Sequence, residues 1–271
     1  MPRALLPFTI LPMNNSPQRP ECPNYGLDAP GVVRSLMIAG VGGLLVAAAA
    51  LTFGAGTPLG MALVWMGACA GLSLAATGCA MIYSSKVGKL RARERWLDLI
   101  AWRGDEQVLD VGCGRGLMLV GAAKRLKTGK AVGIDIWQTE DLSGNHSEAT
   151  IENARREGVA ERVKVQTADM RQIPFPDHSF DVILSCNAVH NLYEAAQRDQ
   201  AVAELARVLK PGGTALIIDI RHISDYAASL VKHGCPEVRQ IGSALKALVA
   251  SLCTLGSLRP GVLLARKAAA A

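Results

Sequence analysis

Charge is what this 271-residue chain lacks most clearly, and the deficit is confined to one stretch. No Asp, Glu, Lys, Arg or His occurs between Ser35 and Ser85, whereas the residues from Lys86 onward have the composition of an ordinary α/β domain. A soluble domain of the remaining size could not bury so long an uncharged stretch in its core. The gap therefore excludes a water-covered surface segment and favours a membrane segment.

Paired cysteines and clustered aromatic residues are also missing. The chain has seven cysteines, an odd number, and none of them forms a CxxC pair. This argues against a disulfide framework or a zinc site, so we expect no metal and reduced thiols in the cytosol. Aromatic residues make up 4% of the chain and do not alternate with the Lys and Arg behind the net charge of +6, so we expect no nucleic-acid partner.

Two apolar runs fill the uncharged stretch and predict a two-helix transmembrane hairpin over residues 32–85. The runs cover about 33–53 and 61–83, each close to the roughly 20 residues that cross a bilayer. The segment GAGTPLG between them is typical of a turn. Residues 1–31 are rich in proline and lack the features of a signal peptide, so we expect them to be irregular.

Small residues recur at helical spacing in both runs: Gly40, Gly43 and Ala47 in the first, Gly67 and Gly71 in the second. Such spacing lets two helices approach closely in lipid. It leaves open whether the hairpin forms a homo-oligomer through its glycines or only anchors the chain. A buried Ala-rich hairpin inside a soluble fold is the alternative interpretation.

Basic residues follow the second run and predict its orientation. Residues 86–103 read as a basic linker and amphipathic helix, with Lys86, Lys89, Arg91, Arg93, Arg95 and Arg103 against Glu94 and Asp98. The turn between the two runs is uncharged. The positive-inside rule then predicts a multi-pass membrane protein with both termini and the C-terminal domain in the cytosol. The cations are also expected to attract anionic lipid.

From residue 104 onward, short apolar strands alternate with amphipathic helices. The strand-like segments are EQVLDV, KAVGIDI, RVKVQTAD, FDVILSC, GTALIIDI and GVLLARK. This alternation predicts a doubly wound α/β sheet over 104–267, followed by a tail at 268–271. In such sheets ligands bind beyond the carboxyl ends of the strands, next to the loop after the first strand.

That loop lacks the last glycine of a dinucleotide-binding motif. It reads GxGxG, with glycines at Gly112, Gly114 and Gly116. Leu117 stands where GxGxxG has its last glycine, which disfavours an NAD-type oxidoreductase. Asp110 would repel a pyrophosphate but suits a cationic amino group, such as that of S-adenosylmethionine. Asp135, at the tip of the second strand, can accept hydrogen bonds from both ribose hydroxyls, so the spacing favours S-adenosylmethionine.

Successive motifs resemble those of class I S-adenosylmethionine-dependent methyltransferases. The motifs are VLDVGCGRG, GIDIW, TADMRQIPFPDHSFDVILSCNAVHNL and ELARVLKPGG. They are most similar to the subgroup of ubiquinone and menaquinone biosynthesis methyltransferases, methyltransferase type 11. The resemblance covers roughly residues 90–267 and not the hairpin. It implies a seven-stranded Rossmann-like sheet with an antiparallel last strand, and S-adenosylmethionine as the cofactor.

The resemblance also implies a set of cofactor-binding residues. Asp110, Gly112 and Gly114 would hold the methionine part, and Asp135 the ribose. Asp169 would meet the adenine amino group, with Met170 and Ile136 on the two faces of the ring, and Cys186 and Asn187 would lie beside the transferred methyl group. The full predicted set is Asp110, Gly112, Cys113, Gly114, Gly116, Asp135, Ile136, Trp137, Asp169, Met170, Cys186 and Asn187.

Two of these assignments have alternatives. Trp137 could stack near the adenine, or it could be a packed side chain in a surface loop. It begins the segment 137–150, which departs from the family pattern and whose role stays open. Cys113 and Cys186 are better interpreted as small packing residues than as nucleophiles.

Methyl transfer from a sulfonium depends mainly on positioning, and a base is needed only if the acceptor loses a proton. We predict His190 as that catalytic base, because histidine exchanges protons near neutral pH, although a structural role is the alternative. The hairpin suggests a small, lipid-soluble or membrane-associated acceptor. A membrane-tethered S-adenosylmethionine-binding module without catalysis and a methyltransferase for a soluble small molecule are the alternatives.

Overall fold

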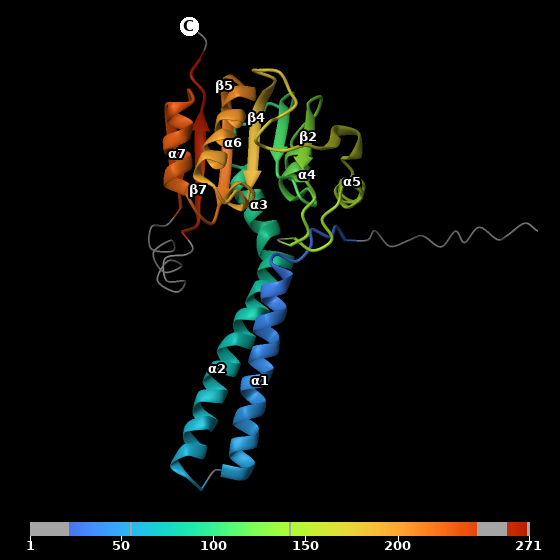
Figure 1. The fold of residues 1–271 in the computed structure, drawn as a ribbon. Coiled ribbons are helices and arrows are strands. Elements are labelled where there is room, and N and C mark those ends of the chain that lie inside the picture. Colours follow the sequence, from blue (N-terminus) through green and yellow to red (C-terminus); the bar gives the residue numbers. More distant parts are fainter. Residues whose placement is uncertain (1–21, 55, 141, 243–258, 270–271) are drawn as a thin grey trace, which may run out of the picture.

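The computed structural model describes residues 22–54, 56–140, 142–242 and 259–269. Figure 1 shows a long helical hairpin that projects from an α/β domain. The hairpin consists of α1 (Pro30–Gly54) and α2 (Pro58–Tyr83). Thr57 caps α2, because its side chain accepts a hydrogen bond from the backbone N–H of Gly60 at 3.0 Å. Most of the predicted irregular segment 1–31 and the end of the predicted tail lie outside the described residues.

The small residues of the two helices face each other inside the hairpin. A Cβ atom on Gly43 would lie 3.0 Å from the carbonyl oxygen of Gly67, and one on Gly71 would lie 2.8 Å from that of Gly40. Close backbone approach of this kind requires glycine. These glycines are therefore used within the chain, and their faces are not free to pair two hairpins.

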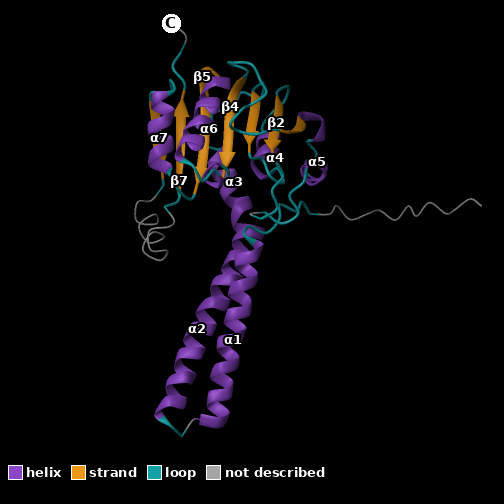
Figure 2. Cartoon of the chain, in the orientation of Figure 1, coloured by secondary structure: helices purple, strands orange, loops and turns teal. Residues whose placement is uncertain are grey.

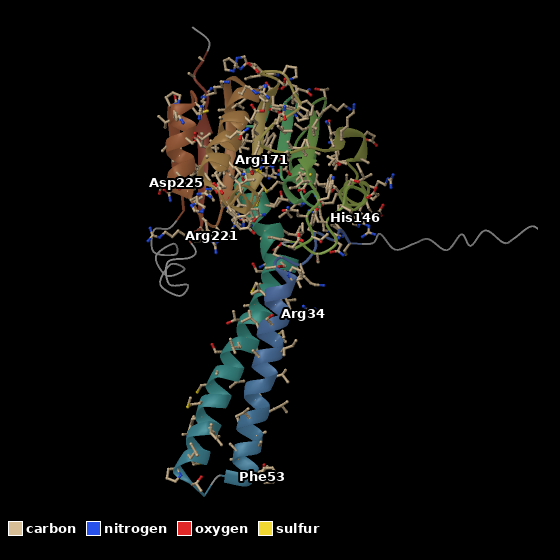
Figure 3. All side chains as sticks on the ribbon, viewed as in Figure 1. Arg34, Phe53, His146, Arg171, Arg221 and Asp225 are labelled. Carbon is tan, nitrogen blue, oxygen red and sulfur yellow. The ribbon has the colours of Figure 1, made fainter. Side chains whose placement is uncertain are left out.

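Large apolar side chains cover the outside of the hairpin. The most exposed of them include Ile38, Leu45, Phe53, Leu59, Trp65, Met66 and Leu72. In Figure 3 the side chains of α1 and α2 splay outward along the whole hairpin, down to Phe53 near its tip. Both helices are long and apolar enough to cross a membrane. They do not supply the core of the domain, so the alternative of a hairpin buried in a soluble fold does not hold among the described residues.

The second helix of the hairpin runs on into the domain without a break. A π-helical turn, η1 (Ser84–Gly88), joins α2 to α3 (Lys89–Leu97). The sequence analysis placed a linker here, but no proline or turn motif interrupts residues 84–97, and the helix continues. The hairpin and the domain therefore share one structural element.

The domain contains a seven-stranded sheet, as the resemblance implied. Its order is β3-β2-β1-β4-β5-β7-β6, and β7 is antiparallel to both of its neighbours. The strands are β1 (Gln107–Val111), β2 (Lys130–Asp135), β3 (Val163–Thr167), β4 (Phe180–Cys186), β5 (Leu209–Asp219), β6 (Glu237–Ile241) and β7 (Gly261–Arg266). The predicted α/β fold class is confirmed. The strand at 237–241 was missed, because it lies at the sheet edge and lacks an apolar run.

Helices cover both faces of the sheet. They are α4 (Leu117–Ala123), α5 (Ser147–Arg156), α6 (Ala195–Val208) and α7 (Ile223–Lys232), with short helices η2 (Ala160–Arg162) and η3 (Val189–Asn191). One apolar cluster packs α6 and α7 against the sheet, and a second packs α3, α4 and α5 against it. This arrangement is a doubly wound α/β fold.

The carboxyl edge of the parallel strands faces the hairpin. In Figure 2 the arrowheads of β2 and β4 point toward α1 and α2. The connectivity explains this direction, because α3 carries the chain from the hairpin along one face of the sheet, and β1 then returns toward the hairpin. Ligands in such sheets bind at the carboxyl edge, so the expected ligand site lies on the hairpin side.

We expect Gly71→Ala to weaken the hairpin. The new methyl group would collide with the backbone of Gly40, and overpacking of this kind costs about 1–3 kcal/mol. Gly42→Ala is the matched control, since a Cβ there has nothing within 4 Å. The full chain is unfolded with SDS in micelles, and the unfolding is monitored by energy transfer between fluorescent labels at the exposed positions Ile38 and Leu72. Equal unfolding midpoints for the two variants would contradict this packing.

Candidate active site

The glycine loop after β1 forms a cradle that other residues could not form. Gly112, Gly114 and Gly116 have φ values of 71°, 53° and 82°, in the region that favours glycine. A Cβ on Gly112 would lie 2.3 Å from the Cβ of Ala188, so the loop passes directly against the segment after β4. Gly112 and Gly114 line a cavity, whereas Gly116 caps α4 and does not.

Asp110, at the end of β1, points a buried carboxylate into this cavity. It is 1% exposed, and neither carboxylate oxygen has a hydrogen-bond partner among the described residues. Burial raises the pKa of Asp110 to about 7 against a smaller opposing effect of the Leu119 backbone, and the charge of Asp135 adds to the rise. An unpaired buried carboxylate is costly in a folded protein, so the site fits a ligand with a cationic group.

Asp135, at the end of β2, holds the cradle in place. One carboxylate oxygen accepts a hydrogen bond from the backbone N–H of Gly114 at 2.8 Å, and the other accepts one from the backbone N–H of Trp137 at 2.6 Å. Ile136 lines the cavity and is half exposed. Trp137 does not line it, because its backbone adopts a φ of 63° and its ring N–H donates to Thr167 on β3. The packed-side-chain interpretation of Trp137 is the one that the structure supports.

Asp169 follows β3 and lies in the same cavity as Met170. Arg171 donates hydrogen bonds to its carboxylate, with Nε 3.1 and 3.0 Å from the two oxygens. Hydrogen bonding to Arg171 holds the pKa of Asp169 below its ordinary value, so the carboxylate stays ionised near neutral pH. An ionised carboxylate at this place can accept a hydrogen bond from an amino group such as that of adenine.

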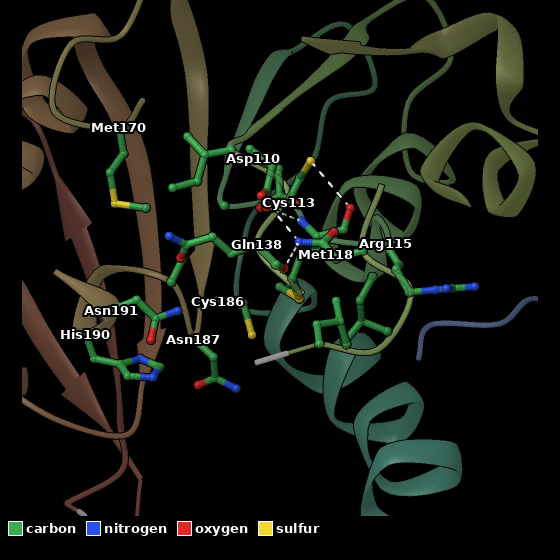
Figure 4. Close-up of a pocket in the computed structure, with 18 of the residues that line it drawn as sticks. Asp110, Cys113, Arg115, Met118, Gln138, Met170, Cys186, Asn187, His190 and Asn191 are labelled. Carbon is green, nitrogen blue, oxygen red and sulfur yellow. Dashed lines mark hydrogen bonds between the residues drawn. The ribbon is translucent and has the colours of Figure 1, made fainter. Parts of the chain in front are cut away.

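Polar side chains gather after β4, on the other side of the cavity. Asn187, His190 and Asn191 line it there, and Figure 4 shows them with Met170 opposite Asp110. Asn187 adopts a φ of 52°, which turns the chain sharply at the end of the strand. They lie on the side of the cavity where the sequence analysis expects the methyl acceptor to bind.

A buried carboxylate lies directly behind His190. Asp219 ends β5, is 1% exposed, and accepts hydrogen bonds from the backbone N–H groups of His190 at 3.1 Å and Ile220 at 2.7 Å. Its Oδ1 lies 2.6 Å from Nδ1 of His190, although the angle there is not that of a hydrogen bond. The carboxylate thus lies against the Nδ1 side of the ring, and Nε2 is the ring nitrogen farther from it. Sequence reasoning missed Asp219, because nothing in its spacing relates it to His190.

Cys113 and Cys186 both line the cavity, where burial raises the pKa of each thiol. A thiol with a raised pKa carries little thiolate at neutral pH and is a poor nucleophile. Both cysteines therefore fit the packing role that the sequence analysis favours.

A segment before the hairpin closes one wall of the cavity. Residues 24–29, here called the N-terminal strap, dock on α5 and α3. The backbone N–H of Asn24 donates to the Asn153 side chain at 2.8 Å. The hydroxyl of Tyr25 contacts Glu157, whose carboxylate also pairs with the buried Arg93 at 2.8 Å. Arg93 was counted among the membrane-flanking cations, but this pairing removes it from the lipid-facing set.

The N-terminal strap also holds the loop between β2 and α5. The backbone N–H of Leu27 donates to Ser143 at 2.8 Å, and Asp28 forms a β-bridge with Leu142. Arg115, inside the glycine loop, donates to carbonyls of both Asn24 and Gly144, each at 2.7 Å. The long segment after Trp137 thus packs over the glycine loop and is tied to the strap.

Asp28 connects the strap to the π-helical turn. Ser85 donates to one of its carboxylate oxygens at 3.0 Å, and Lys89 donates to the other at 3.0 Å. Lys89 also donates to the carbonyls of Tyr25 at 2.8 Å and Gly26 at 3.0 Å. Burial lowers the pKa of Lys89 and Asp28 opposes that effect. We call this set of contacts the Asp28 clasp, and it takes Lys89 out of the lipid-facing set as well.

The cavity that joins these groups has a volume of about 530 Å³, within the usual range for small-molecule sites. It brings together every predicted cofactor-binding residue except Gly116 and Trp137, and His190 as well. Lining residues that the sequence analysis missed include Tyr25, Asp28, Lys89, Met118, Gln138, Asn145, Asn191 and Leu192. They come from the strap, α3, α4 and the loops, where no motif marks them.

In comparison with known proteins, a family model described as "Methyltransferase domain" matches residues 109–217. Methyltransferase GfsG of Streptomyces halstedii is 34% identical over 54% of this chain and 50% of its own length. Sterol 4-C-methyltransferase strm-1 of Caenorhabditis elegans is 32% identical over 46% of this chain and 34% of its own length. The ubiquinone/menaquinone biosynthesis C-methyltransferase UbiE of Chromobacterium violaceum is 32% identical over 45% of this chain and 46% of its own length. The chain thus spans half or less of the length of these relatives.

Solved structures share the fold of the domain. The crystal structure of the [4+2]-cyclase SpnF superposes with a TM-score of 0.52 at 20% identity, over 67% of this chain and 82% of that one. A likeness at this identity concerns the fold alone.

We expect binding of S-adenosylhomocysteine to weaken below about pH 7. We expect its ammonium group to pair with ionised Asp110, and the pKa of about 7 means that this carboxyl gains a proton as the pH falls through that value. The dissociation constant should rise up to about tenfold per pH unit below it. Asp110→Asn keeps the shape and removes the charge, so its weaker binding should lose this dependence. Calorimetry from pH 5 to 8 makes the measurement, and a flat wild-type profile would contradict it.

Proposed function

We propose that the chain uses S-adenosylmethionine, as the class I methyltransferases that it resembles do, to methylate a small acceptor that dissolves in, or is held at, a membrane. One observation carries the proposal. The cavity lies at the sheet edge that faces the apolar hairpin, and its wall includes Ala29, next to α1, and Lys89, just after α2. Relatives named for sterols and quinones support a lipid-like acceptor.

The chain is proposed to be anchored by α1 and α2 with the domain and both termini in the cytosol. The outer surface of the hairpin is apolar, as lipid requires. Exposed cations remain at its domain end, namely Arg34, Lys86, Arg91 and Arg95, and the turn at the tip is uncharged. Figure 3 shows Arg34 on α1 near that end. This asymmetry supports the predicted orientation.

Residues of the cavity are proposed to hold the cofactor by its functional groups. Asp110 offers its unpaired carboxylate to the ammonium group, and Asp169 offers an ionised carboxylate to the adenine amino group. Met170 and Ile136 supply apolar contacts beside the ring. The cofactor, when bound, supplies an electrophilic methyl group on a sulfonium leaving group. The cavity contributes by orienting the acceptor and excluding water, which can supply roughly 7–11 kcal/mol of the barrier.

His190 is proposed to take a proton from the acceptor where the reaction releases one. It lines the cavity, and Asp219 holds its Nδ1 side, so that Nε2 is the nitrogen available to the acceptor. Asp219 does not touch the acceptor in this scheme and acts as a positioning residue. The arrangement has the logic of a base oriented by a carboxylate.

The direct test is labelled methyl transfer into the lipid fraction of the native host. Membranes with the protein and labelled S-adenosylmethionine should gain label in lipid, and membranes without the protein should not. Label confined to water-soluble products would contradict the membrane acceptor and support the soluble one. A protein that binds S-adenosylhomocysteine but transfers no label would be a binding module without catalysis.

We expect His190→Ala to lower kcat by about 10²–10⁴-fold while S-adenosylhomocysteine still binds. Asp219→Asn keeps the side-chain volume but only one of the two oxygens that accept the backbone N–H groups of His190 and Ile220. It should lower kcat by a similar factor, because the ring also loses its orienting charge. The double variant should be little worse than either single variant, since the two residues act as one unit. An unchanged kcat in His190→Ala would contradict the base role.

A further inference from the structure

The number of residues between the cavity and the uncharged run gives the height of the cavity above the hydrocarbon core of the proposed membrane. Ala29 lines the cavity, and the uncharged run of α1 begins at Ser35. The intervening rise along a helix is about 9 Å, at roughly 1.5 Å per residue. The headgroup layer of one leaflet is about 5–8 Å thick. On the other side of the hairpin, Lys89 lines the cavity about one and a half helical turns after Tyr83. The proposed anchoring therefore brings the cavity wall to the outer edge of the headgroup layer.

An exposed aromatic side chain lies at the rim of the same cavity. Leu192 and Tyr193 line it, and Tyr193 is 94% exposed. The backbone there is held firmly, because the buried Arg198 donates to the carbonyls of Leu192 at 2.8 Å and Tyr193 at 2.7 Å. These hydrogen bonds fix the loop, and among the described residues the phenol ring is left almost fully exposed. Tyrosine at such a position is typical of membrane interfaces, where its ring meets lipid and its hydroxyl meets water.

We infer that the cavity opens into the headgroup layer and that Tyr193 inserts there as the lip of the entrance. This inference rests on the proposed function and names its substrate class. The acceptor is an amphiphile that enters from the bilayer between Tyr193 and the N-terminal strap. Its polar head reaches Asn187, His190 and Asn191, and its apolar tail stays in the leaflet. The polar end of the cavity and the apolar surface of the hairpin lie on the same side of the domain, which is the arrangement such a molecule needs.

The test places a photo-crosslinking phenylalanine analogue at position 193 of the full chain. Position 231 on α7 is the matched control, because Val231 is 52% exposed but lies near the end of α7 that points away from the hairpin. In Figure 3, Asp225 already lies farther from the hairpin than Arg221, which shows this direction of α7. Position 38 in α1, where Ile38 is 66% exposed, is the positive control. The probes are vesicles of phosphatidylcholine and phosphatidylglycerol, and binding of S-adenosylhomocysteine checks the fold.

Phospholipid adducts are expected at positions 193 and 38 and not at 231. Adducts at 38 with none at 193 would overturn the lip while leaving anchoring and methyl transfer intact. No adducts at 38 would overturn both the anchoring and the lip. In the labelled-transfer assay, Tyr193→Ser should raise KM for a host lipid extract in vesicles at least severalfold more than it changes kcat. An unchanged KM would contradict entry past Tyr193, whereas absence of transfer in the wild type would contradict the proposed function itself.

Discussion

The Asp28 clasp is the contact on which the geometry of this molecule depends. Asp28 precedes α1 by two residues, and its partners are Ser85 in η1, which follows α2 directly, and Lys89 at the start of α3. One carboxylate therefore joins both domain-side ends of the hairpin. Asp28 is half exposed, so the ion pair itself contributes little free energy. Its effect is positional, because Lys89 also fixes two strap carbonyls and the strap forms a wall of the cavity.

The continuous helix from α2 to α3 transmits this geometry to the sheet. Leu97, at the end of α3, is fully buried against α4, and a Cβ on Gly121 would collide with Arg93 and Leu97. The π-helical turn sets the rotation at which α3 enters the domain, and such turns often mark functional sites. With α3 locked to the sheet and β1 returning toward the hairpin, the carboxyl edge of the sheet has one orientation relative to α1 and α2. The binding site follows that orientation.

The local parts of the site could be predicted from the sequence, and the parts made by tertiary contacts could not. The sequence predicts Asp110, the glycine loop and Asp135 from the chemistry of their side chains and from their fixed spacing along the chain. Except for Gly116, these residues line the cavity. Trp137 was ambiguous because its left-handed backbone, which turns the ring toward Thr167, has no sequence marker. Lys89 and Arg93 read as lipid-facing cations, yet their partners Asp28 and Glu157 lie far along the chain. The spacing of the small residues also could not show whether they pair two hairpins from two chains or the two helices of one hairpin. In the structure they pair the two helices of one hairpin.

The most direct test of the account is the distance from the bound cofactor to the membrane. A fluorescent S-adenosylhomocysteine analogue would be bound to the full chain in vesicles whose headgroups carry an energy acceptor. The comparison is a donor attached at Lys232, an exposed residue at the far end of α7. The account predicts more efficient transfer from the cofactor site than from position 232. Equal transfer, or more efficient transfer from position 232, would contradict a catalytic site that faces the membrane.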